Sequence, residues 1–444
     1  MNKYSREDIL RIVREEDVEF ICLQFTDLFG IMKSVTITAG QVEKALDNRC
    51  MFDGSATQGY VRLQESDMYL YPDTDTFEIF PWRSRQGRAA RLICDVCHPD
   101  GTPFQGDPRF VLKKAVKRAA DMGYVMEVKP ECEFFLFHSD EEEGRPTIQT
   151  HERAGYFDTF PMDLGENVCR DIVTNLEEMD FQVESSHHEI APGQHEIDLG
   201  PMDALRAADQ LLTFKMTAKT IAKSHGLHAT FMPKPKEGVN GSGMHLVLSL
   251  KDSQGKNLFA DPADPLGLSL TARHFMAGIL NHMKEMTLLT NPTVNSYKRL
   301  VPGYDAPVYI AWSPSNSKSC LIRIPSPGGE GIELRCPDGA MNPYLALAAC
   351  LQAGLEGIAK ELELPPCAKE PISLADQEEL NNCGIDRIPN TLGAAIEAYA
   401  GSLFVKNVLG EPIYIKYLEA KEKEWGEFGI QVTDWEIAQY LYQY

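Results

Sequence analysis

The pattern of hydrophobic and polar positions predicts a small, strand-rich region at the start of the chain. Ser5 with Asp8 is typical of a capping box and places the start of a short amphipathic helix there. Two runs of β character, at 19–26 and 31–36, are joined by a Leu-Phe-Gly corner and therefore predict a hairpin. A further strand is expected at 89–96.

A segment rich in Asp, Gly and Pro, at residues 98–109, separates this region from the rest. We place a domain boundary near residue 103, so that the two domains span 1–103 and 104–444. In the second domain, short β-like runs are mixed with long helical patterns without regular βαβ alternation, which favours an α+β fold. The expected strands are 124–128, 134–138 and 244–250; the expected helices are 108–120, 167–179, 204–225 and 270–286, with mostly helix after residue 342.

Composition narrows the class of protein. Of 444 residues, 43% are hydrophobic and 24% are charged, as in an ordinary folded protein. The net charge of -22 argues against a nucleic-acid or anionic-membrane binder. No apolar run approaches ~20 residues and the start has no signal pattern, so we expect a cytoplasmic protein with reduced cysteines. The pair Cys94 and Cys97 would need a second pair to indicate zinc.

Acidic residues at strand spacing are the first candidates for chemistry. In the segment KPECEFFLF, Glu131 and Glu133 lie two positions apart, so both carboxylates face one side of a strand while Cys132 faces the other. A solvated strand edge also fits these two acids. The apolar run that follows, however, indicates that the strand enters a core, where charged groups are usually paired or bound to a cation.

The segment SSHHEIAPGQHEID adds a second acidic pair. Glu189 and Glu196 flank an Ala-Pro-Gly turn, and a tight reversal there would bring the two carboxylates together. Three histidines accompany them, each of which fits either a functional residue or a hydrogen-bonded structural histidine. They are His187, His188 and His195.

Two later segments carry further candidates. Asn240 and Gly241 open a flexible loop before a strand that carries His245; glycine there would let the main chain approach a ligand, although an ordinary loop also fits. Glu333 and Arg335 lie two apart on another strand and face one way. They suit a metal ligand beside an anion-binding guanidinium, or a simple ion pair.

Together these motifs resemble those of the type I glutamine synthetases. Other motifs of that family stand in the same order, from FTDLFG at 25–30 to NPTVNSYKRLVPGY at 291–304. The resemblance implies an N-terminal β-grasp domain and a catalytic domain with a curved antiparallel sheet backed by helices. The compact length and Arg62 resemble the shorter Gram-positive subtype, in which the matching arginine mediates feedback inhibition by glutamine.

The resemblance implies two or more divalent metal ions, Mg²⁺ or Mn²⁺, with ATP as co-substrate. Carboxylates gathered in one cavity repel one another unless cations lie among them, and hard oxygen ligands suit these two metals. Matched by position, the ligands of the first ion are Glu133, Glu189 and Glu196, and those of the second are Glu131, His245 and Glu333.

The reaction that the resemblance implies has two steps. The glutamate γ-carboxylate attacks the terminal phosphate of ATP, and ammonia then displaces phosphate. The positions that match catalytic residues are Asp53, which acts on ammonium across a subunit boundary, Asp305, Lys318 and Arg323. Those that match substrate-binding residues are Asn240, Gly241, His245, Arg299 and Arg335, and those that match nucleotide-binding residues are Glu184, Ser249 and Arg323.

The chain departs from the family pattern between residues 305 and 331. Asp305 replaces the flap glutamate that accepts a proton from the attacking amine, and its side chain is one methylene shorter. Lys318 replaces an arginine that helps phosphoryl transfer, so the charge is kept without the bidentate fork. The run at 326–331 lacks two arginines of the phosphate-binding loop, a loss that commonly lowers turnover.

Three functions are compatible with this sequence. The first is glutamine synthesis from glutamate, ammonium and ATP. The second is γ-glutamyl ligation of another amine, such as a polyamine or alkylamine, because the altered flap lies beside the ammonium pocket; Asp53 counts against a large amine. The third is a weakly active or inactive regulatory paralogue. The resemblance also implies a homo-oligomer, a dodecamer of two hexameric rings, and a transcription factor as a further partner.

Overall fold

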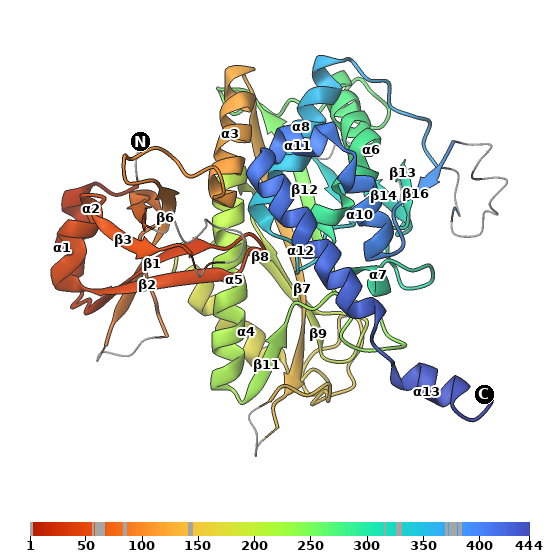
Figure 1. Cartoon of the computed structure of the whole chain (residues 1–444), viewed down its shortest axis with the longest axis horizontal. Coiled ribbons are helices and arrows are strands. Elements are labelled where there is room, and N and C mark those ends of the chain that lie inside the picture. The colour runs from red at the N-terminus through yellow and green to blue at the C-terminus, as the bar shows by residue number, and fades with distance from the viewer. Residues whose placement is uncertain are drawn as a thin grey trace.

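The structure is a computed structural model that describes residues 3–55, 57, 67–82, 87–140, 145–314, 317–325, 331–368, 372, 380 and 384–444. A small N-terminal domain lies to one side of a larger body of sheet and helices (Figure 1). Separate sheets in the two parts, with helices interspersed along the chain, confirm the expected α+β class.

The N-terminal domain is built on a six-stranded sheet in the order β2-β1-β6-β4-β3, with β5 beside β6. β1 and β6 are parallel, and β1 and β2 form the predicted antiparallel hairpin. The capping box of Ser5 and Asp8 is present at the first helix. The elements are α1 (Arg6–Glu15), β1 (Phe20–Thr26), β2 (Met32–Thr38), α2 (Val42–Leu46), β3 (Cys50–Asp53), β4 (Asp67–Pro72), β5 (Glu78–Ile79) and β6 (Ala89–Cys97).

The larger domain is built on a ten-stranded sheet in the order β16-β13-β14-β15-β12-β7-β9-β8, with β10 and β11 also beside β7. All of its pairs are antiparallel except β13 with β14. Its strands are β7 (Val125–His138), β8 (Val183–His188), β9 (Gln194–Leu199), β10 (Met202–Asp203), β11 (Leu227–Thr230), β12 (Met244–Lys251), β13 (Tyr309–Ser313), β14 (Cys320–Arg323), β15 (Ile332–Leu334) and β16 (Asp386–Arg387).

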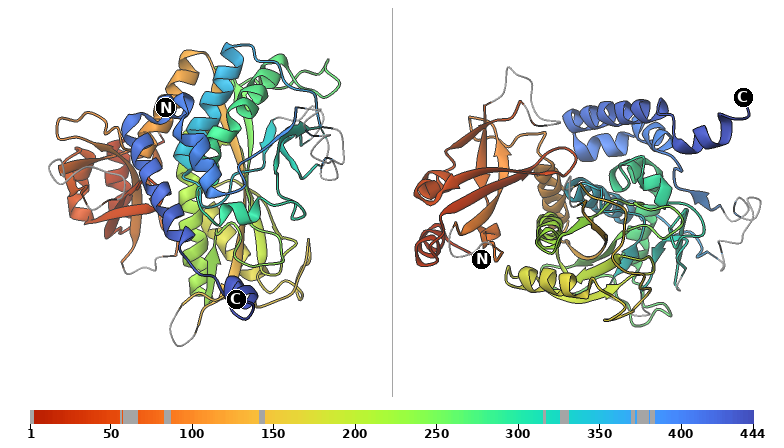
Figure 2. Two further views of the ribbon diagram at one scale, coloured as in Figure 1. Left: turned by 45° about the vertical axis from the view of Figure 1, so that its right-hand side comes forward. Right: turned by 90° about the horizontal axis from the view of Figure 1, so that it is seen from below.

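Helices pack against this sheet and against one another, and the buried apolar residues of α5, α6 and α8 form much of the main core with the strands. The last helix, α13, extends away from the body toward the C-terminus (Figures 1 and 2). The helices are α3 (Pro108–Asp121), α4 (Glu166–Glu177), α5 (Ala204–Ser224), α6 (Leu270–Thr290), α7 (Ser296–Arg299), α8 (Pro343–Ala359), α10 (Leu392–Ala400), α11 (Leu403–Leu409), α12 (Glu411–Gly429) and α13 (Asp434–Tyr440).

One strand differs from its predicted form. β7 runs without interruption from Val125 to His138, where two short strands at 124–128 and 134–138 were expected. The apolar pattern is interrupted between them because the intervening acidic residues face a polar cavity and not the core. The backbone nevertheless stays extended, since β12 pairs with residues 125–132 and β9 with residues 131–135.

The described cysteines form no disulfide bonds. Ten of them, in the described part of the chain, are free thiols, and Cys94 and Cys97 are both buried. Burial raises the pKa of the Cys94 thiol well above its usual value, so this thiol is a poor metal ligand or nucleophile. None of the helices in the described ranges combines the length and apolarity required to span a bilayer.

Candidate active site

Neighbouring strands of the large sheet carry acidic and imidazole side chains to one face. Glu133 on β7 lies directly opposite Glu196 on β9, and His187 on β8 lies opposite Glu196 from the other side. Glu131 on β7 lies opposite His245 on β12. Because directly opposed residues of antiparallel strands have adjacent side chains, the strand register brings these groups into one row.

The turn between β8 and β9 adds Glu189 to this row. Gly193 adopts a φ of +75°, a conformation that favours glycine, so the chain reverses within a few residues, as the Ala-Pro-Gly sequence predicts. His187 Nε2 lies 3.2 Å from Glu189 Oε1 and 3.6 Å from Glu196 Oε2. The two carboxylates that flank the turn therefore meet at one imidazole.

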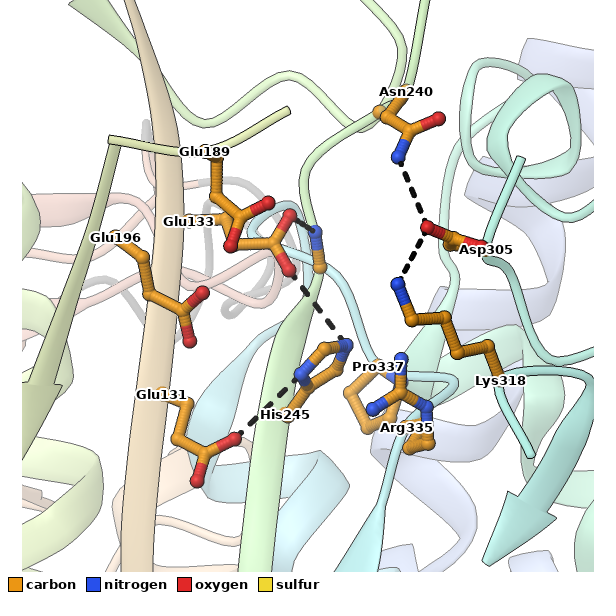
Figure 3. Close-up of polar contacts among 12 residues, drawn as sticks. Glu131, Glu133, Glu189, Glu196, Asn240, His245, Asp305, Lys318, Arg335 and Pro337 are labelled. Carbon is orange, nitrogen blue, oxygen red and sulfur yellow. Dashed lines mark hydrogen bonds and ion pairs between the residues drawn. The ribbon is translucent and has the colours of Figure 1, made fainter. Parts of the chain in front are cut away.

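The row of side chains lines a cavity of about 220 Å³. In Figure 3, the glutamates lie on one side and His245 faces them, while Asp305 and Lys318 lie on the opposite side. Within the described residues, seven carboxylates and four lysine or arginine side chains line the cavity. The excess negative charge favours the binding of cations, because carboxylates this close destabilise one another when they are all ionised.

Two clusters in the cavity have the donor atoms of metal sites. One consists of Glu131, His245 and Glu333, and the other of His187, Glu189 and Glu196; in each, one donor atom per residue lies within 4.8 Å of the others. Burial, followed by the charge of Arg335, lowers the pKa of His245 well below its usual value. The imidazole is therefore neutral near pH 7, the form that binds metals. These donor sets fit divalent cations such as Mg²⁺ or Mn²⁺.

Glu133 lies between the two clusters. Its Oε2 accepts hydrogen bonds from Gly243 N at 2.9 Å and Gln194 Nε2 at 2.8 Å, and its Oε1 lies 3.7 Å from His245 Nε2. Burial and the charge of Glu189 together raise the pKa of Glu133 to about 7. A bound cation would reverse this effect by stabilising the ionised carboxylate.

Glu189 and Glu196 titrate as a pair. Burial and the nearby Glu133 raise the pKa of Glu196 well above its usual value. Burial acts in the same direction on Glu189, but hydrogen bonds from His187 and from the Glu196 carboxyl lower its pKa. Without a cation, the pair therefore holds a proton that metal ions would displace.

Two arginines contact Glu333, which is fully buried. Arg323 Nε and Arg335 Nη1 both donate to its carboxylate. Arg335 Nε is buried and has no hydrogen-bond partner, which leaves it free for an anionic ligand. Arg299 instead donates to main-chain carbonyls at the end of β15, namely those of Arg335 at 3.0 Å, Cys336 at 2.8 Å and Pro337 at 3.3 Å. It holds the segment that carries Arg335.

The two residues that depart from the family pattern are partners. Lys318 Nζ donates to Asp305 Oδ2 at 2.8 Å, and Asn240 Nδ2 lies 3.5 Å from the same oxygen (Figure 3). Asp305 has a φ of +53°, which few non-glycine residues adopt, so its loop is held in a tight turn. The shorter acid and the lysine thus form one ion pair on the side of the cavity opposite the glutamates.

Some of the expected site residues lie outside the cavity. Asp53, at the end of β3, is exposed and accepts a hydrogen bond from Ser55 N at 2.9 Å. Glu184 pairs with Lys129 at 2.6 Å, and Ser249 is buried on β12. Arg62 and residues 326–330 lie outside the described residues.

The sequence pattern did not identify every residue of the cavity. Gln194, Glu196 and Asp198 alternate along β9 and all line it. The period of two that identified Glu131 and Glu133 would have found Gln194 and Asp198 as well. Tyr156 and Tyr304 also line the cavity but come from loops, where no periodicity marks them.

Comparisons with known proteins agree with this architecture. Residues 17–99 match the family model for the glutamine synthetase β-grasp domain, and residues 105–440 match the model for the glutamine synthetase catalytic domain. A glutamine synthetase of Clostridium saccharobutylicum is 54% identical over 447 residues and covers 100% of both chains. One of Staphylococcus aureus is 51% identical over 444 residues and covers 99% of both chains.

Solved structures share the fold. GmaS in complex with ADP superposes with a TM-score of 0.88 at 32% identity, covering 98% of this chain and 99% of that one. The glutamine synthetase of Plasmodium falciparum superposes with a TM-score of 0.86 over 99% of both chains, at 24% identity. The expected β-grasp domain and curved catalytic sheet are thereby confirmed.

Proposed function

The chain belongs to the glutamine synthetase family, in its type I branch of the short Gram-positive kind, and we propose that the acidic cavity is its catalytic site. The activity is the ATP-dependent formation of glutamine from glutamate and ammonia. Full-length similarity to curated glutamine synthetases does not favour ligation of another amine or a regulatory paralogue.

The observation that supports this site is the meeting of two ligand clusters in one cavity. Glu131, His245 and Glu333 would hold one divalent ion, and Glu189 and Glu196 would hold a second with Glu133, which lies between the clusters. Bound there, Mg²⁺ or Mn²⁺ would neutralise phosphate and carboxylate charges and so let two anionic substrates approach. Arg323 also lines the cavity, so its positive charge would add to this neutralisation.

The substrate glutamate would bind on the arginine side of the cavity. The free Nε of Arg335 is suited to a carboxylate, since a buried guanidinium makes strong charge-assisted hydrogen bonds. Arg299 would act on it indirectly by fixing the main chain at 335–337. Asn240 lies across the cavity, where its amide can hydrogen-bond the polar groups at the other end of glutamate.

Asp305 would take the proton from the amine that attacks the γ-glutamyl phosphate. Its carboxylate lines the cavity, and Lys318 and Asn240 orient one of its oxygens. The hydrogen bond from Lys318 keeps the short arm directed across the cavity instead of toward solvent. Lys318 is thus a positioning residue for the proton acceptor in addition to supplying positive charge.

A neighbouring subunit would complete the site. Asp53 is exposed at the end of β3, outside the cavity of its own chain. Its carboxylate could therefore serve the cavity of another copy, which fits a ring-shaped homo-oligomer such as the dodecamer that the family resemblance implies. The transcription-factor partner belongs to the same proposal and would be tested by co-purification.

The decisive assay measures phosphate release by the purified chain with Mg²⁺, ATP and glutamate. We expect release to depend on ammonium, and methylamine or a polyamine not to replace it. In the same assay, Glu131→Gln should raise the Mg²⁺ concentration for half-maximal activity by about tenfold or more, because one metal ligand is lost.

Glu127→Gln is the matched control for this variant. Glu127 lies four positions earlier on the same face of β7, but it pairs with Lys251 and not with the cavity. Its variant should keep the wild-type Mg²⁺ dependence. Equal Mg²⁺ dependence of Glu131→Gln and the wild type would refute the assignment of the metal site.

A further inference from the structure

A second polar cavity lies between the two domains, away from the catalytic site. Its volume is about 390 Å³. Asp73, Asp75, Glu78 and Arg91 of the N-terminal domain line one side, and residues of α5, including Gln210, line the other. In Figures 1 and 2, the N-terminal domain faces α3 and α5 of the larger domain.

Arg91 is a buried cation without a partner in this cavity. It lies on β6, and only 3% of its surface is exposed. Its Nε and Nη1 atoms are buried and have no hydrogen-bond partner. Burial lowers the pKa of its guanidinium even though Glu78 and Asp209 act in the opposite direction. Glu78, directly opposite on β5, and Asp209 offset part of its charge, but buried N–H donors without acceptors are costly, so the cavity favours an anion that would accept their hydrogen bonds.

The other charged groups of the cavity already have partners. Lys3 Nζ lies 2.6 Å from Glu78, and Arg206 Nη2 donates to the main-chain oxygen of Asp180 at 3.2 Å. Arg109 is paired with both Asp73 and Asp209. Among the described residues that line the cavity, Arg91 is therefore the one arginine or lysine that awaits a counter-ion.

An acceptor without a partner faces the same cavity. Gln210 Oε1, on α5, is buried and receives no hydrogen bond. A ligand that satisfies both residues must therefore offer an anionic group to Arg91 and an N–H or O–H donor to Gln210. A bare anion would satisfy only the first.

We propose that this cavity binds a small carboxylic acid that also carries a hydrogen-bond donor, either an amino acid or a hydroxy acid. Its carboxylate pairs with Arg91, and its amine or hydroxyl donates to Gln210. A carboxylate fits better than phosphate because a single unpaired guanidinium balances one negative charge, and the surrounding carboxylates repel further charge. Since Arg91 and Gln210 belong to different domains, the ligand bridges them and stabilises their contact.

The test is a calorimetric titration of the full-length protein with glycine, glycolate, acetate and inorganic phosphate. Glycine and glycolate separate the amino acid from the hydroxy acid, acetate lacks the donor, and phosphate lacks the carboxylate. We expect at least one of the first two to bind more tightly than acetate and phosphate. For the probe that binds most tightly to the wild type, the dissociation constant should rise at least about tenfold in Arg91→Met. Binding of a probe in the catalytic cavity is the same in the wild type and in Arg91→Met, so it does not contribute to the difference between their dissociation constants.

Arg88→Met is the matched control, because Arg88 is a more exposed arginine that pairs with Glu16 just before β6. The Arg88→Met variant should bind the same probe with the affinity of the wild type. Retained glutamine synthesis by Arg91→Met would show that the variant folds, so that loss of binding reports on the cavity.

Gln210→Glu gives a second, independent variant. It places a carboxylate in the cavity with Arg91, so it should weaken ligand binding at least about tenfold and raise the thermal midpoint of the free protein. Unchanged affinity in both variants, a loss of phosphate binding in Arg91→Met as large as that of the organic acids, or no binding of any of the four probes would overturn the proposal. In the last case Arg91 is satisfied by water alone.

Discussion

At the scale of single residues, the catalytic cavity depends on charges whose partners come from distant segments. Glu333 on β15 receives Arg323 from β14 and Arg335 from its own strand end. Asp305 and Lys318 come from two different loops and meet at 2.8 Å. Such pairs fix the direction of a carboxylate. This orientation is important for proton transfer and phosphoryl transfer, whereas the pairs contribute little to the stability of the fold.

The pair Asp305 and Lys318 can be tested by a double-mutant cycle of Asp305→Asn and Lys318→Met. Both side chains are nearly half exposed, at 42% and 48%, so each variant should change the free energy of unfolding by less than about 1 kcal/mol. Each should nevertheless lower kcat/KM for ammonium about tenfold or more, and the double variant should lose less than the product of the two. Urea unfolding and steady-state kinetics measure these effects. Multiplicative losses would show that the residues act independently.

At the scale of elements, the turn between β8 and β9 is held from behind by a buried carboxylate. Glu152 accepts hydrogen bonds from the main-chain nitrogens of Gly193 and Ala154, and its Oε1 lies 3.1 Å from His188 Nε2. These contacts fix the turn whose ends carry Glu189 and Glu196. No periodic pattern marks Glu152 in the sequence, because it lies in an irregular segment before α4.

Glu152→Ala should therefore affect both folding and metal binding. Buried donors would be left without partners, so the free energy of unfolding should fall by about 2 kcal/mol or more. The Mg²⁺ concentration for half-maximal activity should rise about tenfold, because the ligands would lose their support. Glu152→Gln keeps the shape and one acceptor. Its stability and its Mg²⁺ dependence should therefore lie between those of the wild type and those of Glu152→Ala. A purely structural role would lower stability and leave the Mg²⁺ dependence unchanged.

Asp107 caps the N-terminus of α3, and its titration predicts a pH dependence of stability. Burial, followed by the charge of Asp95, raises the pKa of Asp107 from 3.8 to about 7. Between about pH 4 and pH 7, the unfolded chain loses this proton while the folded chain retains it. The stabilisation is therefore full below about pH 4 and is lost as the pH rises through about 7.

Asp107→Asn removes this titration while keeping a residue that can cap a helix. Relative to the wild type, the variant should thus gain stability between pH 5 and pH 8, by on the order of 1 kcal/mol or more. Thermal unfolding midpoints at the two pH values measure the difference. A constant difference between variant and wild type would mean that Asp107 is ionised at both.

At the scale of the whole molecule, Arg109 connects the two domains. It lies at the start of α3 and is 2% exposed. Its guanidinium pairs with Asp73 and Asp95 of the N-terminal domain, at 2.7 and 2.6 Å, and with Asp209 of α5, at 2.9 Å. One cation thus compensates three acids from both sides of the domain contact, beside the cavity that contains Arg91.

Arg109→Met should separate the unfolding of the two domains. Three buried or half-buried carboxylates would lose their cation, so stability should fall by about 3 to 5 kcal/mol. Calorimetry should show the N-terminal domain unfolding in a separate, earlier transition. Lys113→Met is the control, because Lys113 pairs with Asp95 at 38% exposure and should cost less than about 1 kcal/mol. A single cooperative transition in Arg109→Met would contradict this account.

The sequence by itself determined the local features of this protein. Strand periodicity placed Glu131 and Glu133 on one face of β7, and the Ala-Pro-Gly turn predicted the reversal that joins Glu189 to Glu196. Family motifs determined the α+β fold and the activity. The strand periodicity and the turn depend on few neighbouring residues, because alternation and turn geometry are properties of short segments.

Only the tertiary structure decided which segments meet. The ligand clusters meet because of the strand register across β15, β12, β7, β9 and β8. Arg299 donates hydrogen bonds to main-chain carbonyls, and Lys318 donates one to Asp305. The unpaired state of Arg91 is likewise visible only when the two domains are in contact. Such pairings result from the packing of many residues far apart in the chain, so no single short segment specifies them.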